Sequence, residues 1–453
     1  MRTILEGKES IAQLWGHPKP KDTAYRLMKY LLRVEVEDGV LLHNCVTRHL
    51  ILLTNDEAEI LTNLPARFTE PMQDLIADHF LVPEDFDEYR SVNQLRRIYQ
   101  SRSTGTAIDH YEILPTTFCN AHCFYCYESD YPRIHMTEET ANRIVDYIDE
   151  HREGRRVKIG WFGGEPLVGI KRIDQISQGL KDRDVPFAAS MITNGYLFDE
   201  EIIKRSVSLW NLQRVQITLD GTEDTYNRVK AYAEAKENPF RRVMRNIDLL
   251  AENKILVNIR LNVDFYNKDD IRALIEELGE RYGGNKYVSV YMNMLFNHLG
   301  YEPVHHSQED LIELQQIIGE YTEVLKGLNV STNGRSIPSL QVSQCMADNP
   351  HSIEIQPDGS FCRCEHESVL DSYGSIEKGI FDPEKPKLWK ETVERSDHCP
   401  DCCFYPFCFL LRRCMNADVP CEEDTRLAFR DQSIKMLQSV YLKSLEEKKN
   451  EKV

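Results

Sequence analysis

Features typical of membrane, secreted and nucleic-acid-binding proteins are scarce in this sequence. No window contains about 18 uninterrupted apolar residues, so a membrane-spanning helix is not expected. The first residues, MRTILEGKES, lead into polar and Pro-rich sequence and not into the apolar core of a secretion signal. Positive charge is in deficit, because 55 Lys and Arg stand against 73 Asp and Glu, a net charge of −18. That balance disfavours a nucleic-acid backbone as partner. We expect a cytoplasmic protein with neither a nucleic-acid nor a membrane partner.

Cysteine, by contrast, is plentiful and clustered. Of the 13 cysteines, Cys45 stands alone, three lie between residues 119 and 126, and nine lie between residues 345 and 421. In a compartment where thiols stay reduced, tight cysteine clusters are typical of metal or redox sites and not of disulfides. The sequence therefore directs attention to two metal or redox regions.

The chain is long for one domain, and its pattern changes along its length. The N-terminal segment predicts a small α+β module, because Glu37-Asp38-Gly39 is a hairpin signal between two apolar runs. Three strands followed by three helices is the order of a winged-helix-like unit. We expect strands at 30–36, 40–44 and 48–53, helices at 57–64, 72–80 and 85–99, and domains at 1–107, 108–327, 328–430 and 431–453, the last a C-terminal helix and tail.

The central segment alternates strands and helices, which predicts a parallel sheet with right-handed crossovers. Six such units are too few for a closed eight-stranded barrel and fit an open, partial (β/α)6 barrel. In barrels of this kind the chemistry gathers at the C-terminal ends of the strands. We expect strands at 111–118, 157–163, 188–194, 215–220, 257–263 and 288–294, with helices at 138–151, 168–180, 240–252 and 269–282.

The segment 328–430 is rich in Cys, Pro and Gly and has little regular periodicity. A hairpin is expected at 353–364, around Pro357-Asp358-Gly359. With so little apolar material, this segment is expected to need metal to hold its fold.

Three cysteines follow the first strand of the alternating segment, at the place where a barrel puts an active-site loop. Cys119, Cys123 and Cys126 are spaced so that their thiolates can surround one face of a cuboidal iron–sulfur cluster, and three thiolates leave one of four irons open. Taken alone, the same residues also suit buried thiols or part of a zinc site, although structural zinc prefers four closed ligands.

This cysteine spacing, with aromatic Tyr125 before the last cysteine, resembles the signature of radical S-adenosylmethionine (SAM) enzymes. The resemblance implies that the three cysteines hold a [4Fe-4S] cluster whose open iron binds SAM. An electron from that cluster would cleave SAM to a 5′-deoxyadenosyl radical. Further family motifs follow in order at strand ends, and the resemblance implies that they contact SAM: Gly163, Gly164, Glu165 and Pro166 (GGEP), Thr193 and Asn194 (TNG), Thr218 and Asp220 (TLDG), and Arg260 and Asn262 (RxN).

One position departs from the family pattern. Many relatives carry an Arg where this chain has Lys230, and the resemblance would place this residue at the SAM carboxylate. Because Lys cannot form the bidentate contact of an Arg, Arg228 is the alternative.

The late cysteines resemble the SPASM extension of radical SAM enzymes, which carries two auxiliary [4Fe-4S] clusters. With the SAM cluster, this implies three [4Fe-4S] clusters. By the family arrangement, the first auxiliary cluster would be bound by Cys345, Cys364 and Cys414. Cys362 would be its fourth ligand, or one iron would stay open for a substrate thiolate. The second would be bound by Cys399, Cys402, Cys408 and Cys421.

SPASM enzymes act mainly on peptides and proteins, and the pattern 41–61 resembles the leader-binding segment of radical SAM peptide maturases. We expect an enzyme that installs a thioether or carbon–carbon cross-link in a ribosomally made precursor peptide and takes electrons from a flavodoxin or ferredoxin. The alternatives are an anaerobic sulfatase-maturating enzyme that forms formylglycine and a non-catalytic iron–sulfur electron carrier or leader-binding scaffold.

Overall fold

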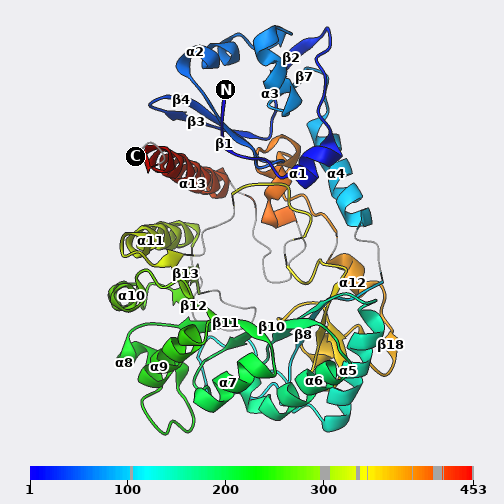
Figure 1. Ribbon diagram of the computed structural model, residues 1–453, viewed down its shortest axis with the longest axis vertical. Coiled ribbons are helices and arrows are strands. Elements are labelled where there is room, and N and C mark those ends of the chain that lie inside the picture. The colour runs from blue at the N-terminus through cyan, green and yellow to red at the C-terminus, as the bar shows by residue number, and fades with distance from the viewer. Residues whose placement is uncertain are drawn as a thin grey trace. The chain divides into compact units, whose positions relative to one another are not determined.

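The computed structural model describes residues 1–102, 106–295, 307–332, 337–343, 345–389, 391–411, 421 and 423–450 (Figure 1). The chain forms two compact units. The first comprises Met1–Thr104, Arg335–Gln344 and Glu391–Val453, and the second comprises Gly105–Gly334 and Cys345–Lys390. The Cys-rich segment therefore contributes residues to both units. Each unit is described by itself.

The second unit is built on a long sheet with the order β14-β13-β12-β11-β10-β9-β8-β15-β16-β17-β18. Pairing is parallel from β14 to β15 and antiparallel beyond β15. Together with the family match described below, this confirms the expected partial barrel. The strands are β8 (His110–Ile113), β9 (Val157–Trp161), β10 (Phe187–Thr193), β11 (Leu212–Leu219), β12 (Leu256–Val263), β13 (Val288–Met294), β14 (Ser331–Thr332), β15 (Ser352–Ile355), β16 (Ser360–Cys362), β17 (Gly374–Ser375) and β18 (Gly379–Ile380).

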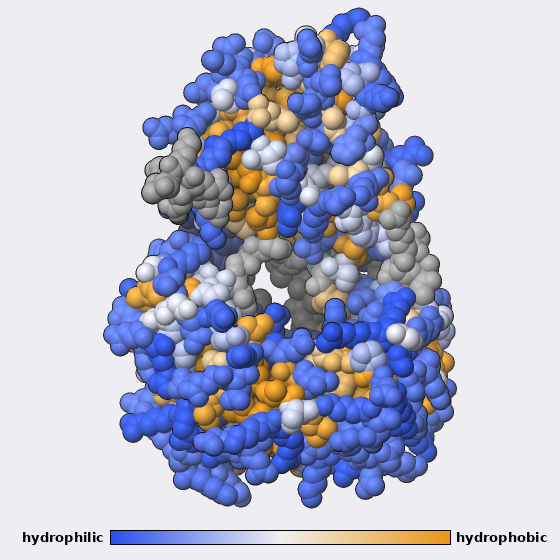
Figure 2. Space-filling model, in the orientation of Figure 1, coloured by the Kyte–Doolittle hydropathy of each residue, from blue (hydrophilic) through white to orange (hydrophobic). Residues whose placement is uncertain are grey.

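Helices cover one face of this sheet, and alternate strand residues pack against them in one apolar core. Trp161 of β9 and Ile217 of β11 are fully buried there. The outer surface of the helices is largely hydrophilic in Figure 2, as expected for amphipathic helices. The helices of this unit are α5 (Glu138–His151), α6 (Ile170–Asp182), α7 (Glu200–Ser208), α8 (Glu223–Lys230), α9 (Pro239–Glu252), α10 (Lys268–Tyr282), α11 (Gln308–Gly327) and α12 (Lys385–Leu388), of which α12 contributes no residue to this core.

Two features of the sheet differ from the expectation. The first strand ends at Ile113, well before residue 118, because Pro115 has no N–H with which to continue the ladder. The expected hairpin at 353–364 is present as β15 and β16, but β15 also pairs in parallel with β8 and so extends the barrel wall.

The first unit contains a four-stranded antiparallel sheet of order β1-β5-β4-β3 and a three-stranded sheet of order β6-β2-β7. The expected hairpin is present, with Glu37 and Asp38 as its turn. Its strands are β1 (Arg2–Leu5), β2 (Ala24–Leu27), β3 (Leu31–Val36), β4 (Gly39–Asn44), β5 (Leu50–Leu53), β6 (Ala66–Arg67) and β7 (Leu81–Pro83), and its helices are α1 (Glu9–Trp15), α2 (Asn55–Ala58), α3 (Gln73–Ala77), α4 (Glu88–Arg102) and α13 (Glu423–Asn450).

The C-terminal helix of this unit packs on its sheet. Leu437 and Tyr441 of α13 lie in the same apolar cluster as Leu32 and Leu41, and the Tyr441 hydroxyl donates to Asp38 at 2.6 Å. Among the helices that the structure describes, none is long and apolar enough to cross a membrane.

Candidate active site

The loop that carries Cys119, Cys123 and Cys126 follows β8 and docks on the end of β9. The N–H of Glu165 donates to the Phe118 carbonyl at 2.9 Å, and the N–H of Gly164 donates to the Thr116 carbonyl at 3.3 Å. A Cβ on Gly164 would lie 2.5 Å from the Phe118 oxygen, closer than real Cβ contacts. Gly163 has a φ of +109° and is equally crowded, since its Cβ would lie 2.3 Å from the Thr116 oxygen. The two glycines therefore make room for the cysteine loop itself.

Glu165 joins the GGEP and TNG motifs. Its fully buried carboxylate accepts hydrogen bonds from the Thr193 hydroxyl at 2.8 Å, the Asn194 N–H at 2.8 Å and the Leu167 N–H at 3.1 Å. A carboxylate has about four acceptor positions, so one remains for a further donor. Burial raises the pKa of Glu165 to about 7, against the hydrogen bonds that lower it. Pro166 begins the short 3₁₀ turn Pro166–Gly169 that follows.

Asp220, at the end of β11, is the centre of a second buried network. Its carboxylate accepts from the Tyr125 hydroxyl at 2.7 Å and from the Asn262 amide at 3.0 Å, and it pairs with the Lys230 ammonium at 2.9 Å. Lys230 also donates to the Tyr125 hydroxyl at 2.9 Å. Burial opposes the charged form of Lys230, but Asp220 and other nearby groups raise its pKa well above the usual value. The ammonium is thus already neutralised within the protein.

The RxN residues extend this network along β12. The Arg260 Nε donates to the Asn262 side chain at 2.9 Å, and Thr218 is the parallel partner of Arg260 on β11. The motifs expected at the ends of four strands are therefore held close to the cysteine loop. Whether each of these residues contacts SAM stays a prediction.

The three loop thiols suit a shared iron–sulfur cluster. Burial raises the pKa of Cys119 to about 12 and of Cys126 to about 11, and Cys123 adds to both shifts, so the three sulfurs lie near one another. The Ala121 N–H, at 3.4 Å, and the Asn194 amide, at 3.9 Å, both donate to the Cys119 sulfur. Iron would displace the thiol protons on binding. The donor set, three thiols with N–H groups directed at sulfur, fits the cluster that the sequence implies.

The late cysteines lie in both units. In the first unit, burial raises the pKa of Cys408 to about 11, and Cys402, Cys421 and Cys399 each raise it further, so these four thiols are neighbours. In the second unit, Cys345 is exposed and Cys364 is buried, while Cys414 lies outside the described residues. Within the described part of the chain, no three His, Cys, Asp or Glu side chains are arranged to hold a single metal ion.

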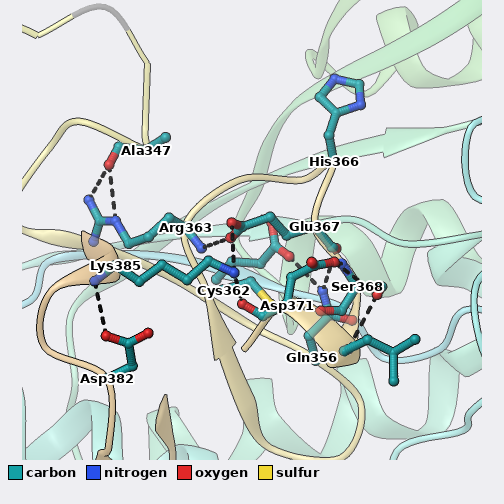
Figure 3. A network of polar contacts seen from close by, with 12 residues as sticks. Ala347, Gln356, Cys362, Arg363, His366, Glu367, Ser368, Asp371, Asp382 and Lys385 are labelled. Atoms are coloured by element: carbon teal, nitrogen blue, oxygen red, sulfur yellow. Dashed lines mark hydrogen bonds and ion pairs between the residues drawn. The ribbon is translucent and has the colours of Figure 1, made fainter. Parts of the chain in front are cut away.

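Cys362 has a different environment from the other candidate ligands. It is fully buried, and its thiol donates to the Ser368 carbonyl at 3.3 Å. Around it lies a polar network in which Glu367 accepts from the Arg363 N–H at 2.7 Å and pairs with Lys385 at 3.3 Å (Figure 3). Burial raises the pKa of this thiol strongly.

Sequence reasoning missed two asparagines that hold the site together. Asn120 accepts from the Asn194 side chain at 2.7 Å, which links the cysteine loop to β10. Asn267 is buried and donates to the carbonyls of Asp220 and Asn262 at 3.0 and 2.9 Å. Position within the cysteine motif could have suggested Asn120, but nothing in the sequence marks Asn267.

Comparison with known proteins assigns the class. Residues 113–335 match the family model described as the radical SAM superfamily. This stretch is a radical SAM domain, and the protein is an enzyme. A curated relative, the GTP 3′,8-cyclase of Clostridium perfringens (strain 13 / Type A), is 24% identical over 307 residues, which cover 64% of this chain and 90% of the relative.

Two solved structures share the fold at low sequence identity. The anSMEcpe protein, solved with AdoMet and the Cp18Cys peptide, has a TM-score of 0.54 and 17% identity, over 76% of this chain and 99% of that one. Streptococcus suis SuiB, solved with the precursor peptide SuiA, has a TM-score of 0.51 and 14% identity, over 85% of this chain and 94% of that one.

Proposed function

We propose that the protein is a radical SAM maturase that installs a cross-link, thioether or carbon–carbon, in a ribosomally made precursor peptide. When bound, a reduced four-iron cluster at Cys119, Cys123 and Cys126 supplies the electron that cleaves SAM. A flavodoxin or ferredoxin is the proposed electron source. The remaining acceptor position of Glu165 suits the SAM ammonium. Arg260 suits the SAM carboxylate better than Lys230, whose charge is matched by Asp220.

The auxiliary clusters belong to the same proposal. Cys399, Cys402, Cys408 and Cys421 would bind one, and Cys345, Cys364 and Cys414 would bind the other. The hydrogen bond of Cys362 to Ser368 favours the alternative in which Cys362 is not a ligand and one iron of the second of these clusters accepts a substrate thiolate.

The observation that carries the peptide assignment is the open edge of β3 in the first unit. Among the described strands, β3 pairs only with β4. The Cys45 N–H donates to the Tyr30 carbonyl, so Tyr30 and Cys45 form a hydrogen-bonded pair. In an antiparallel hairpin every second residue pair is hydrogen-bonded in this way, counting from that pair. Arg33 and Glu35 fall in the alternate positions. Their N–H and C=O groups therefore point away from β4 and are available to an added peptide strand. The peptides in the anSMEcpe and SuiB structures support the same substrate class.

Arg33→Pro tests this edge selectively. Proline removes an N–H that points outward and leaves the β3–β4 ladder intact, and Arg33→Ala is the matched control. We expect random peptides displayed on mRNA, selected on the reconstituted wild-type enzyme, to bind Arg33→Ala as they bind wild type and to bind Arg33→Pro weakly. Equal retention by both variants would contradict the docking mode.

The reaction is tested by mass spectrometry of the selected peptides after incubation with SAM and a reductant. A cross-link removes two hydrogen atoms from the peptide, and 5′-deoxyadenosine accumulates. The likeness to anSMEcpe favours a sulfatase-maturating enzyme as second candidate, which would instead convert a Cys-containing sulfatase peptide to an aldehyde that a hydrazide traps. Failure to form 5′-deoxyadenosine with reduced clusters would support a non-catalytic carrier or scaffold.

A further inference from the structure

A group of carboxylates lines the inner wall of the second unit and is not used by the proposed SAM site. Glu354 of β15 and Glu112 of β8 are direct partners in the parallel register. Their neighbours in the strands, Ile353 and Ile113, belong to the apolar core under the helices. Because side chains alternate along a strand, the two glutamates face the opposite, barrel-lining side.

The buried carboxylate of Glu354 has one oxygen without a hydrogen-bond donor among the described residues. Its side chain is 0% exposed, and one carboxylate oxygen accepts from the Gln356 amide at 2.6 Å. The other oxygen has no hydrogen-bond partner among the described residues. The side-chain oxygen of Gln356, two residues along the same face, is buried and also without a described partner. Two acceptors directed to one face call for a ligand rich in N–H groups.

The surrounding charged groups indicate that this ligand is positively charged. Burial raises the pKa of Glu354 well above its usual value, and the carboxylates of Glu365, Glu112 and Glu367 raise it further, although Glu367 is already paired with Lys385. On the other side, His110 contacts Glu112 at 3.1 Å. A cation bound at this position would therefore stabilise the charged form of Glu354, which burial and the neighbouring carboxylates disfavour.

The cluster also has a solvent-facing end. The Glu112 side chain is 21% exposed, whereas Glu354 is fully enclosed. On β9 the parallel partner of Glu112 is Gly160, where a Cβ would lie 1.8 Å from a Glu112 carboxylate oxygen. The missing side chain at Gly160 gives that carboxylate its place on the barrel wall.

We propose that this wall binds a cationic side chain of the substrate, an ammonium or guanidinium, with Glu354 and Gln356 accepting its N–H groups and Glu112 providing further negative charge. The inference rests on the proposed peptide substrate and narrows it: the segment held in the barrel carries a Lys or Arg. Charge-assisted hydrogen bonds at a buried carboxylate account for the selectivity.

The test measures binding of small probes to the reconstituted holoenzyme by calorimetry. We expect Nα-acetyl-lysine amide or Nα-acetyl-arginine amide to bind about tenfold tighter than Nα-acetyl-norleucine amide, which has a similar length and no charge. Glu354→Gln should abolish that preference. Glu150→Gln, which removes an exposed charge from α5, should keep it. Equal binding of charged and uncharged probes by wild type would overturn the proposal, and so would an intact preference in a folded Glu354→Gln variant.

Two further measurements distinguish this proposal from its alternatives. N-Butylguanidine is a singly charged guanidinium without a peptide backbone, so tighter binding of N-butylguanidine than of acetyl-arginine amide would overturn the assignment to a peptide side chain. The 5′-deoxyadenosine assay is run on the same wild-type sample. Probe selectivity without SAM cleavage would support the cation site while contradicting the maturase, and SAM cleavage without selectivity would do the reverse.

Discussion

Removal of the Lys230 ammonium should destabilise the second unit and loosen the cysteine loop. Lys230 and Asp220 form a buried ion pair, with side chains 5% and 0% exposed and charged atoms 2.9 Å apart. In Lys230→Met the Asp220 carboxylate would keep only two neutral donors, Tyr125 and Asn262. Breaking one side of a buried pair typically costs about 3–5 kcal/mol, since the other charge stays buried without its partner.

A double-mutant comparison isolates that cost. Asp220→Asn combined with Lys230→Met leaves no uncompensated charge, so the double variant should recover most of the stability that the single variant loses. The assay is the anaerobic melting temperature, which should fall by at least about 6 °C in Lys230→Met. Lys204→Met, on an exposed position of α7, is the matched control and should leave the melting temperature unchanged.

The same variant has a second readout at the cluster. Tyr125 lies between two of the cysteines, and its hydroxyl is held by Asp220 and Lys230. We expect Lys230→Met to bind less iron and to form less 5′-deoxyadenosine than Lys204→Met. If Lys230→Met melts like the control and retains full iron, the buried pair does not hold the loop and the reasoning is refuted.

Three further predictions follow from other parts of the structure. Gly164→Ala should displace the cysteine loop from Phe118, lower iron incorporation and reduce 5′-deoxyadenosine formation; normal iron content would contradict the docking described here. Burial lowers the pKa of His43 to about 4, so the unfolded chain takes up a proton below about pH 6.5 that the folded chain does not. Stability is therefore complete above that pH and should fall by about 2 kcal/mol by pH 5, a loss that denaturant titration should find absent in His43→Gln. Cys408→Ser should lower iron by about four atoms per chain, measured with labile sulfide, and unchanged iron would remove Cys408 from the cluster ligands.

The alternation of strands and helices could be predicted from the sequence because strands covered by helices on one face carry apolar side chains at alternate positions. In residues 157–161 and 257–263 apolar side chains alternate with polar ones or glycine, and the structure places β9 and β12 there. The GGEP, TNG and TLDG motifs lie at the ends of such strands, and the RxN motif lies within β12. The neighbourhood of the motifs was therefore predictable from the parallel sheet alone.

Partners that are distant in sequence could not be predicted. β1 pairs with β5 across about fifty intervening residues, and β15 joins β8 although more than 230 residues separate them. Local periodicity carries no information on such pairing. For the same reason the sequence suggested one Cys-rich domain, whereas its residues belong to two units. The contact of Lys230 with Asp220 could not be predicted either, because the family pattern placed the Lys230 side chain at the SAM carboxylate.

The glycines of the GGEP motif show why the motifs occur together. Their missing side chains make room for the backbone at Thr116 and Phe118, and the next residue, Glu165, is bound through its carboxylate to Thr193 and Asn194. One short turn therefore fixes the cysteine loop on one side and the end of β10 on the other. A substitution in any of these three segments should therefore shift the positions of the other two. The order of motifs along the chain is thus the consequence of neighbouring strand ends that pack against one loop, and the same packing would hold the loop thiols beside the Glu165 carboxylate.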